Sequence, residues 1–260
     1  MEYSNLSAGS IRSRLKDVNE KIVKACAAAG RNPDEVTLLA VSKTKPVSAV
    51  MEALEAGQVY FGENYVQELV QKVEFFSGEG TADKLTGSEI LPPDALPSPV
   101  WHMIGHLQRN KVKYIAGKTA LIHSVDSAAL ADQIEKESAK RDVVSDILLE
   151  LNIAGEDTKW GFSAADAPAC AEYIKQSLPH VRLLGLMTSA PYTENPETNR
   201  VHFRNLKNLS DAIARDGLFD CETPVLSMGM TGDYEVAIQE GATIVRVGTG
   251  IFGERDYSKT

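Results

Sequence analysis

Cysteine is scarce in this sequence: the 260 residues contain three, Cys26, Cys170 and Cys221. Their odd number, wide spacing and lack of any Cys-x-x-Cys pair argue against a disulfide framework and a zinc knuckle. Neither a leading apolar segment nor a run of about 18 apolar residues occurs, so we expect no secretory signal and no membrane-spanning helix. Reduced thiols are typical of a cytosol-like compartment. We therefore expect a cytoplasmic protein with no membrane partner, and a mitochondrial location stays open.

Basic residues are also few relative to acidic ones. Lysine and arginine total 27 against 36 aspartates and glutamates, which gives a net charge of -9. Such a chain repels nucleic-acid backbones at long range, so we expect no nucleic-acid partner, although a local basic pocket could still take a small anion. Hydrophobic residues make up 43% and charged residues 24%, the balance of an ordinary globular protein.

Short apolar runs alternate with helix-like segments along the chain. Candidate strands span 36–42, 58–61, 100–104, 120–124, 146–152, 182–187, 224–228 and 243–247. Helices are predicted near 46–56, 63–76, 107–116, 127–140, 164–177, 197–215 and 232–240, with a further amphipathic helix at about 10–29. Repeated strand–helix order indicates parallel strands joined by right-handed crossovers.

Eight strands in a chain of this length match a (β/α)8 TIM barrel, an α/β fold that we expect to occupy residues 1–260 as a single domain. A doubly wound open sheet is the structural alternative. It usually needs fewer strands, and no Gly-x-Gly-x-x-Gly follows the first strand here. Residues 77–99 interrupt the alternation, and because they are rich in Gly, Pro and Ser we interpret them as a surface insertion.

Lys43 directly follows the first predicted strand. In a (β/α)8 barrel the C-terminal ends of the strands carry the functional residues, so the amine of this lysine would face the barrel mouth. Desolvation and nearby cations favour a neutral amine, the form that attacks an aldehyde to give a Schiff base. The alternative is a solvated loop lysine.

Glycine-rich loops follow the last two predicted strands, at 227–232 and 248–250. Such loops expose backbone N–H groups that favour an anion, and barrels of this class often bind phosphate there. Arg246 would add charge or meet a ring nitrogen. Together with Lys43, the loops predict a ligand that carries both an aldehyde and a phosphate, as pyridoxal 5'-phosphate (PLP) does. The alternative is that glycine only permits the turns.

Other polar residues give weaker signals. His102 and His106 have the spacing of a helical metal pair, but Gly105 and the strand-like run make a helix doubtful. We therefore favour packing or loop hydrogen bonding and predict no metal site. Asn64 could hydrogen-bond a ligand or cap a backbone group. The sequence contains no recognisable Ser/His/Asp triad or P-loop.

The same stretches resemble the YggS/PROSC family of pyridoxal phosphate homeostasis proteins. The matching segments are LAVSKTKP at 39–46, FGENYVQE at 61–68, WHMIGHLQRNK at 101–111, GLM at 185–187, LSMGMT at 226–231 and VRVGTGIFG at 245–253. There are mild departures: Thr231 stands where many members have serine, and Gly250 where many have alanine. Compact bacterial members also lack the 77–99 insertion.

The resemblance implies a (β/α)8 barrel similar to the N-terminal domain of alanine racemase, a fold-type III PLP architecture. It implies that Lys43 holds PLP as a Schiff base and that Asn64 lies near the ring. The residues that it places at the phosphate end are Ser227, Gly229, Arg246, Gly248 and Thr249. It also implies that the protein buffers and delivers PLP, with apo PLP-dependent enzymes as recipients and no established catalytic activity.

Three function classes can be weighed. A fold-type III racemase or decarboxylase is the alternative to a PLP carrier, and a cofactor-free Schiff-base aldolase is the third. Racemases that resemble this barrel carry a second domain, and two-base proton transfer needs groups on both faces of the substrate. A lone barrel leaves the cofactor open to water, so we expect a carrier without substrate turnover. The sequence contains no recognisable exposed apolar stripe, so it does not decide between a monomer and a weak homodimer.

Overall fold

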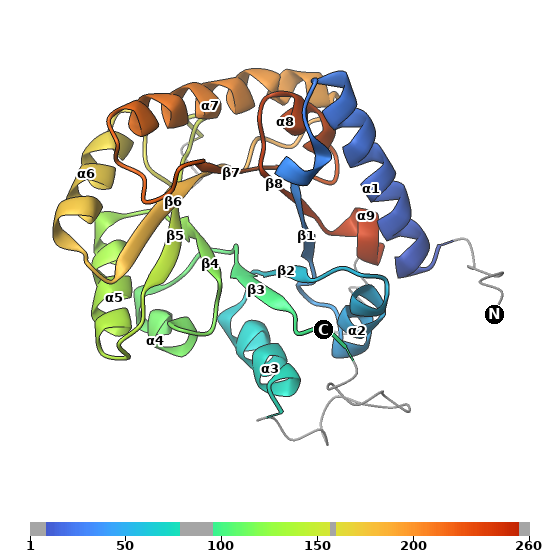
Figure 1. The fold of residues 1–260 in the computed structure, drawn as a ribbon, viewed down its shortest axis with the longest axis horizontal. Coiled ribbons are helices and arrows are strands. Elements are labelled where there is room, and N and C mark those ends of the chain that lie inside the picture. The colour runs from blue at the N-terminus through green and yellow to red at the C-terminus, as the bar shows by residue number, and fades with distance from the viewer. Residues whose placement is uncertain (1–8, 79–95, 157–159, 255–260) are drawn as a thin grey trace.

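Eight parallel strands close into a barrel in chain order, with β8 paired to β1 (Figure 1). The strands are β1 (Thr37–Val41), β2 (Tyr60–Glu63), β3 (Val100–Met103), β4 (Leu121–Val125), β5 (Ser145–Glu150), β6 (Val181–Met187), β7 (Val225–Met230) and β8 (Ile244–Val247). This computed structural model describes residues 9–78, 96–156 and 160–254. The predicted barrel is confirmed, and the pairing of β1 with β8 rules out an open sheet. Of the predicted insertion at 77–99, residues 79–95 lie outside the described ranges.

Helices surround the barrel (Figure 1). They are α1 (Ile11–Ala28), α2 (Val47–Glu55), α3 (Val66–Phe76), α4 (Val112–Ile115), α5 (Ala128–Ala139), α6 (Ala167–Ser177), α7 (Arg200–Arg215), α8 (Tyr234–Gln239) and α9 (Thr249–Phe252). The helix predicted at 107–116 is shorter than expected, because a 3-10 turn (Arg109–Lys111) precedes the short α4. The helix predicted from residue 63 begins at Val66, since Glu63 still pairs with Met103 in the sheet.

The N-terminal helix α1 lies outside the ring of strands and packs against α2, α8 and α9. Ser10 caps it by accepting a 3.2 Å hydrogen bond from the backbone N–H of Ser13. Ile11, Leu15 and Val18 lie on its buried face, at the three- and four-residue steps that the sequence pattern requires. The predicted amphipathic helix is therefore present. It packs against α8 and α9, the last two helices in the chain order given above.

Apolar side chains fill the barrel interior. Leu39, Leu121, Leu148, Met187 and Ile244 form one buried cluster contributed by different strands. A second, larger cluster of buried residues joins the strands to the helices around them. Two residues further along β8 than Ile244, Arg246 follows on the same face of the strand, so the interior becomes polar toward the C-terminal ends of the strands. Within the described ranges, no helix has the length and apolar character needed to cross a bilayer.

Candidate functional site

A cavity of about 600 Å³ lies at the C-terminal ends of the strands. Its lining brings together residues that are far apart in the sequence: Val41, Lys43, Asn64, Ile104, Ser189, Pro191, Tyr192, Thr193, Asn199, Met230, Thr231, Gly232, Asp233, Arg246, Gly248 and Thr249. Lys43, Asn64, Arg246, Gly248 and Thr249 are predicted site residues, and the structure places all of them around this one cavity. The volume is typical of a small-molecule site.

Lys43 lies in a tight turn directly after β1, and its side chain is half-buried. The backbone N–H of Lys45 closes the turn on the carbonyl of Ser42 at 3.0 Å, and Thr44 adopts a left-handed φ of 61°. A non-glycine residue in this conformation is strained unless its surroundings hold it. Here the carboxylate of Glu68 accepts a 2.7 Å hydrogen bond from the Thr44 N–H. The turn is thus held from α3.

A second residue of α3 holds the other side of the turn. The Lys72 ammonium donates to the carbonyl of Ser42 at 2.9 Å and to the carboxylate of Glu63 at 2.7 Å. Ser42 Oγ donates to the same Glu63 oxygen at 2.6 Å. Burial raises the pKa of Glu63, and the charge and hydrogen bond of Lys72 oppose that shift. These contacts fix the peptide groups on both sides of Lys43, and sequence analysis alone missed them.

Arg246 is the buried cation of the cavity, with 5% of its surface exposed. Its guanidinium donates to Ser227 Oγ at 2.7 Å and to the Thr188 carbonyl at 2.9 Å. Burial lowers the pKa of Arg246 to about 10, while the charges of Glu150 and Asp233 oppose the shift. The side chain therefore stays cationic at neutral pH and is available to an acceptor atom or an anion in the cavity.

Two predicted residues, Ser227 and Gly229, are not among those that line the cavity. Ser227 is fully buried against Arg246. Gly229 has a φ of 89°, and a Cβ there would lie 2.6 Å from Ala237 Cβ and 2.8 Å from Tyr234 Cα. Glycine is thus required where β7 packs on α8. Direct contact of these two residues with a phosphate stays a prediction.

The loops after β7 and β8 are hydrogen-bonded to each other. Thr231 Oγ1 accepts from the backbone N–H groups of Gly248 at 3.3 Å and Gly250 at 3.5 Å. The Asp233 carboxylate accepts from the Met230 N–H at 2.6 Å and from Asn199 Nδ2 at 2.8 Å. Asp233 therefore ties the loop after β7 to Asn199 with both of its oxygens engaged, and residues of both loops line the cavity.

Thr231 and Gly250, the two positions where the resemblance implies departures, lie against each other. A Cβ on Gly250 would lie 3.2 Å from Thr231 Cγ2, the methyl group that serine lacks, and 2.9 Å from Val247 Cγ1. Thr231 thus occupies space beside the position where an alanine side chain would project. We infer that the methyl group at 231 fills space that a methyl group at 250 would otherwise occupy.

We expect this compensation to appear as coupling between two substitutions. The cost of Gly250→Ala should be about 1 kcal/mol greater in the native sequence than in a Thr231→Ser background, because serine removes one of the two close contacts. Urea unfolding of the wild type, both single variants and the double variant measures it. Equal costs in the two backgrounds would contradict the compensation.

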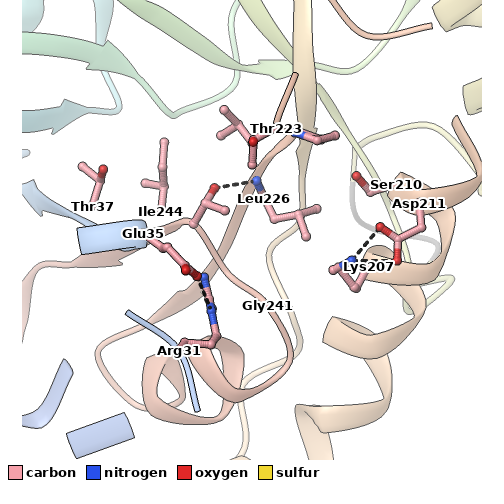
Figure 2. A pocket seen from close by; sticks show the side chains of 13 residues that line it. Arg31, Glu35, Thr37, Lys207, Ser210, Asp211, Thr223, Leu226, Gly241 and Ile244 are labelled. Carbon is pink, nitrogen blue, oxygen red and sulfur yellow. Dashed lines mark hydrogen bonds and ion pairs between the residues drawn. The ribbon is translucent and has the colours of Figure 1, made fainter. Parts of the chain in front are cut away.

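A second cavity, of about 530 Å³, opens near the N-terminal ends of β1, β7 and β8 (Figure 2). Its charged residues already pair with one another: Arg31 with Glu35 at 3.2 Å and Lys207 with Asp211 at 2.6 Å. Arg31 also donates to the carbonyls of Ile238 and Ala242 at the end of α8. These contacts join α8 to the segment before β1, so we assign this cavity a structural role.

The cavity lined by Lys43 and Arg246 is the candidate site, because it brings together most of the predicted site residues. Comparisons with known proteins identify the family of the chain. Residues 15–256 match the family model described as alanine racemase, N-terminal domain. The pyridoxal phosphate homeostasis protein of Aquifex aeolicus is 46% identical over 244 residues, which cover 94% of this chain and 98% of that protein. The chain belongs to the YggS/PROSC family of pyridoxal phosphate homeostasis proteins.

Other YggS/PROSC relatives agree. The pyridoxal phosphate homeostasis protein of Escherichia coli K12 is 39% identical over 250 residues, covering 96% of this chain and 98% of that one. The structure of PipY from Synechococcus elongatus with PLP bound superposes with a TM-score of 0.75 at 30% identity, covering 94% of this chain and all of that chain. The predicted family and its alanine racemase-like barrel are thus confirmed.

Proposed function

We propose that this protein binds PLP in the C-terminal cavity, holds it on Lys43 as a Schiff base, and buffers and delivers it in the cell without turning over a substrate. One observation carries the proposal: the Lys43 amine shares a cavity with the Arg246 cation and with the linked loops after β7 and β8. The names of the curated relatives and the PLP-bound PipY structure support PLP as the ligand.

The donor set of the cavity fits this cofactor. PLP supplies an aldehyde for a primary amine and a phosphate for hydrogen-bond donors. Lys43 Nζ is the amine that would hold the aldehyde carbon, with the aldehyde oxygen lost as water. The N–H groups and hydroxyls of Gly248, Thr249 and Thr231 suit the phosphate, and Asn64 suits the polar atoms of the ring. Arg246, which the resemblance places at the phosphate end, also suits a ring nitrogen, and we assign it to the ring here.

The residues around the cavity also favour a carrier over a racemase. Two-base proton transfer needs a second acid–base group facing Lys43 across the substrate. Among the cavity-lining residues that the structure describes, Asp233 has both oxygens engaged in hydrogen bonds and Tyr192 is 95% exposed. Asp233 is held by the loops and not turned to a substrate, and Tyr192 extends into solvent, so neither supplies the second acid–base group. We infer that the recipients of the bound PLP are apo PLP-dependent enzymes.

Reduction by borohydride tests the attachment directly. The protein loaded with PLP should be yellow, lose its visible band on reduction, and carry the pyridoxyl mass on the peptide that contains Lys43. Lys72, the buried neighbouring amine, is the internal control and should stay unlabelled. A label on Lys72, or on no lysine, would contradict the proposed attachment.

Isotope exchange tests the absence of turnover. The loaded protein is incubated with D- or L-alanine in deuterated water, and exchange at Cα is followed by mass spectrometry. A carrier should give no exchange above that of free PLP. Turnover of about 1 per second or faster, in the range of ordinary enzymes, would overturn the carrier assignment.

A further inference from the structure

Polar side chains cross the barrel interior below the cavity in a single buried chain of hydrogen bonds. Arg246 Nη1 donates to Ser227 Oγ at 2.7 Å, and Ser227 Oγ lies 2.8 Å from His123 Nδ1. His123 Nε2 lies 2.9 Å from His102 Nδ1. These residues come from β8, β7, β4 and β3 in turn. Because β7 and β4 are not neighbours in the barrel, the contact between Ser227 and His123 spans its interior.

The chemistry of the groups gives this chain one direction. An arginine can only donate, so Ser227 Oγ accepts from Arg246. Of the two side-chain partners that the structure gives Ser227 Oγ, only His123 Nδ1 can accept, so the arrangement that satisfies the hydroxyl proton has Ser227 donating to His123 Nδ1. In that arrangement His123 carries its proton on Nε2 and donates it to His102 Nδ1. Both imidazoles are therefore held as the Nε2–H tautomer by the position of the arginine.

The environment keeps both imidazole rings neutral. Donation in the order Arg246, Ser227, His123, His102 requires neutral rings. Burial lowers the pKa of His102 to about 4. Burial, with the charges of His102 and Arg246, lowers the pKa of His123 well below its ordinary value. A protonated imidazole would donate from both nitrogens and would oppose an N–H or O–H donor of its neighbour. At neutral pH the chain therefore holds a single arrangement.

We propose that Ser227, His123 and His102 are positioning residues, which fix the guanidinium of Arg246 at the floor of the cavity through this chain. Arginine side chains carry many rotamers, and a guanidinium ordered before the ligand arrives loses less entropy on binding. The inference rests on the proposed function, in which Arg246 faces PLP. Ser227 would thus act on the ligand through Arg246.

Nitrogen-15 NMR of the histidine rings in the full-length protein tests the chain itself. His102 and His123 should both show the neutral Nε2–H tautomer from roughly pH 6 to 8, the range in which a free histidine titrates. In Ser227→Ala, His123 should gain a population of the Nδ1–H form, because the donor to Nδ1 is gone. A protonated Nδ1 on His123 in the wild type would overturn the direction of the chain.

Equilibrium binding of PLP tests its effect on the site. Ser227→Ala should weaken binding about tenfold, whereas Ser145→Ala, which removes a buried serine–serine hydrogen bond of 2.8 Å at the start of β5, should leave it unchanged. If the two variants lose comparable thermal stability, weaker PLP binding in Ser227→Ala alone reports the positioning of Arg246 and not a general loss of folding. Unchanged binding in Ser227→Ala alongside weakened binding in Arg246→Gln would reject the positioning role alone. Unchanged binding in both would reject the proposed placement of PLP.

Discussion

Replacing Lys43 by alanine is expected to weaken PLP binding by roughly 100-fold or more and to abolish the visible band of the loaded protein. The half-buried amine is the group of the cavity that can form a covalent bond with an aldehyde, and the other lining residues would offer only hydrogen bonds and charge. Equilibrium dialysis against PLP and absorbance spectroscopy measure the two effects.

Lys43→Arg separates the amine from its charge. Arginine keeps the cation but is not a nucleophile at neutral pH, so this variant should also lack the visible band while it retains part of the electrostatic attraction for the phosphate. Lys24→Ala, which removes an exposed lysine from α1, is the matched control and should bind PLP like the wild type. A visible band that survives in both Lys43 variants would place the attachment at another lysine.

The barrel could be predicted because parallel strands covered by helices are buried on both sides. Residues 37–41 are a continuous run with little polar character, and their burial on both faces explains it. Lys43 could be found for a related reason: it stands two positions after the last residue of this run, and the ends of barrel strands converge on one face. The predicted boundaries were less accurate, as in α3, where strand pairing retains Glu63.

Side-chain direction was harder to predict. Ser227 and Gly229, which the sequence places in a loop at 227–232, lie in β7 (Val225–Met230), and the pairing of β7 with β8 shifts its register between Ser227 and Met230. Such an irregularity changes which residues face inward, and the local sequence carries no clear sign of it. Ser227 consequently contacts Arg246, whereas Thr231 and Gly232 line the cavity.

Contacts between distant segments were also beyond sequence reasoning. Glu68 and Lys72 have the ordinary spacing of a helical ion pair, and nothing local connects them with the turn at Lys43. His102 and His106 have the spacing of a helical pair, but they lie in different surroundings. His102 hydrogen-bonds to His123 inside the barrel, in line with the predicted packing or hydrogen bonding, while His106 Nδ1 lies 3.1 Å from the carboxylate of Asp126.

Adding a methyl group at position 105 is expected to destabilise the fold by about 3 kcal/mol and to weaken PLP binding in the molecules that remain folded. A Cβ on Gly105 would lie 2.6 Å from Asn64 Cα and 2.9 Å from its carbonyl carbon. These are backbone atoms, so no rotamer change relieves the overlap, and the loops after β2 and β3 must separate. That separation moves Asn64 away from the cavity that it lines.

Urea unfolding and PLP binding of Gly105→Ala together measure this effect, and Gly217→Ala is its control. Gly217 has a φ of 67° and no atom within 4 Å of an added Cβ, so alanine there costs about 1 kcal/mol from backbone conformation without any collision. Gly105 is not among the glycines with positive φ, so its excess cost must come from the contact with Asn64. The prediction is wrong if Gly105→Ala loses no more stability than Gly217→Ala and binds PLP with unchanged affinity. The loops after β2 and β3 would then move apart at little cost, and the close contact of Gly105 with Asn64 would not set the position of Asn64.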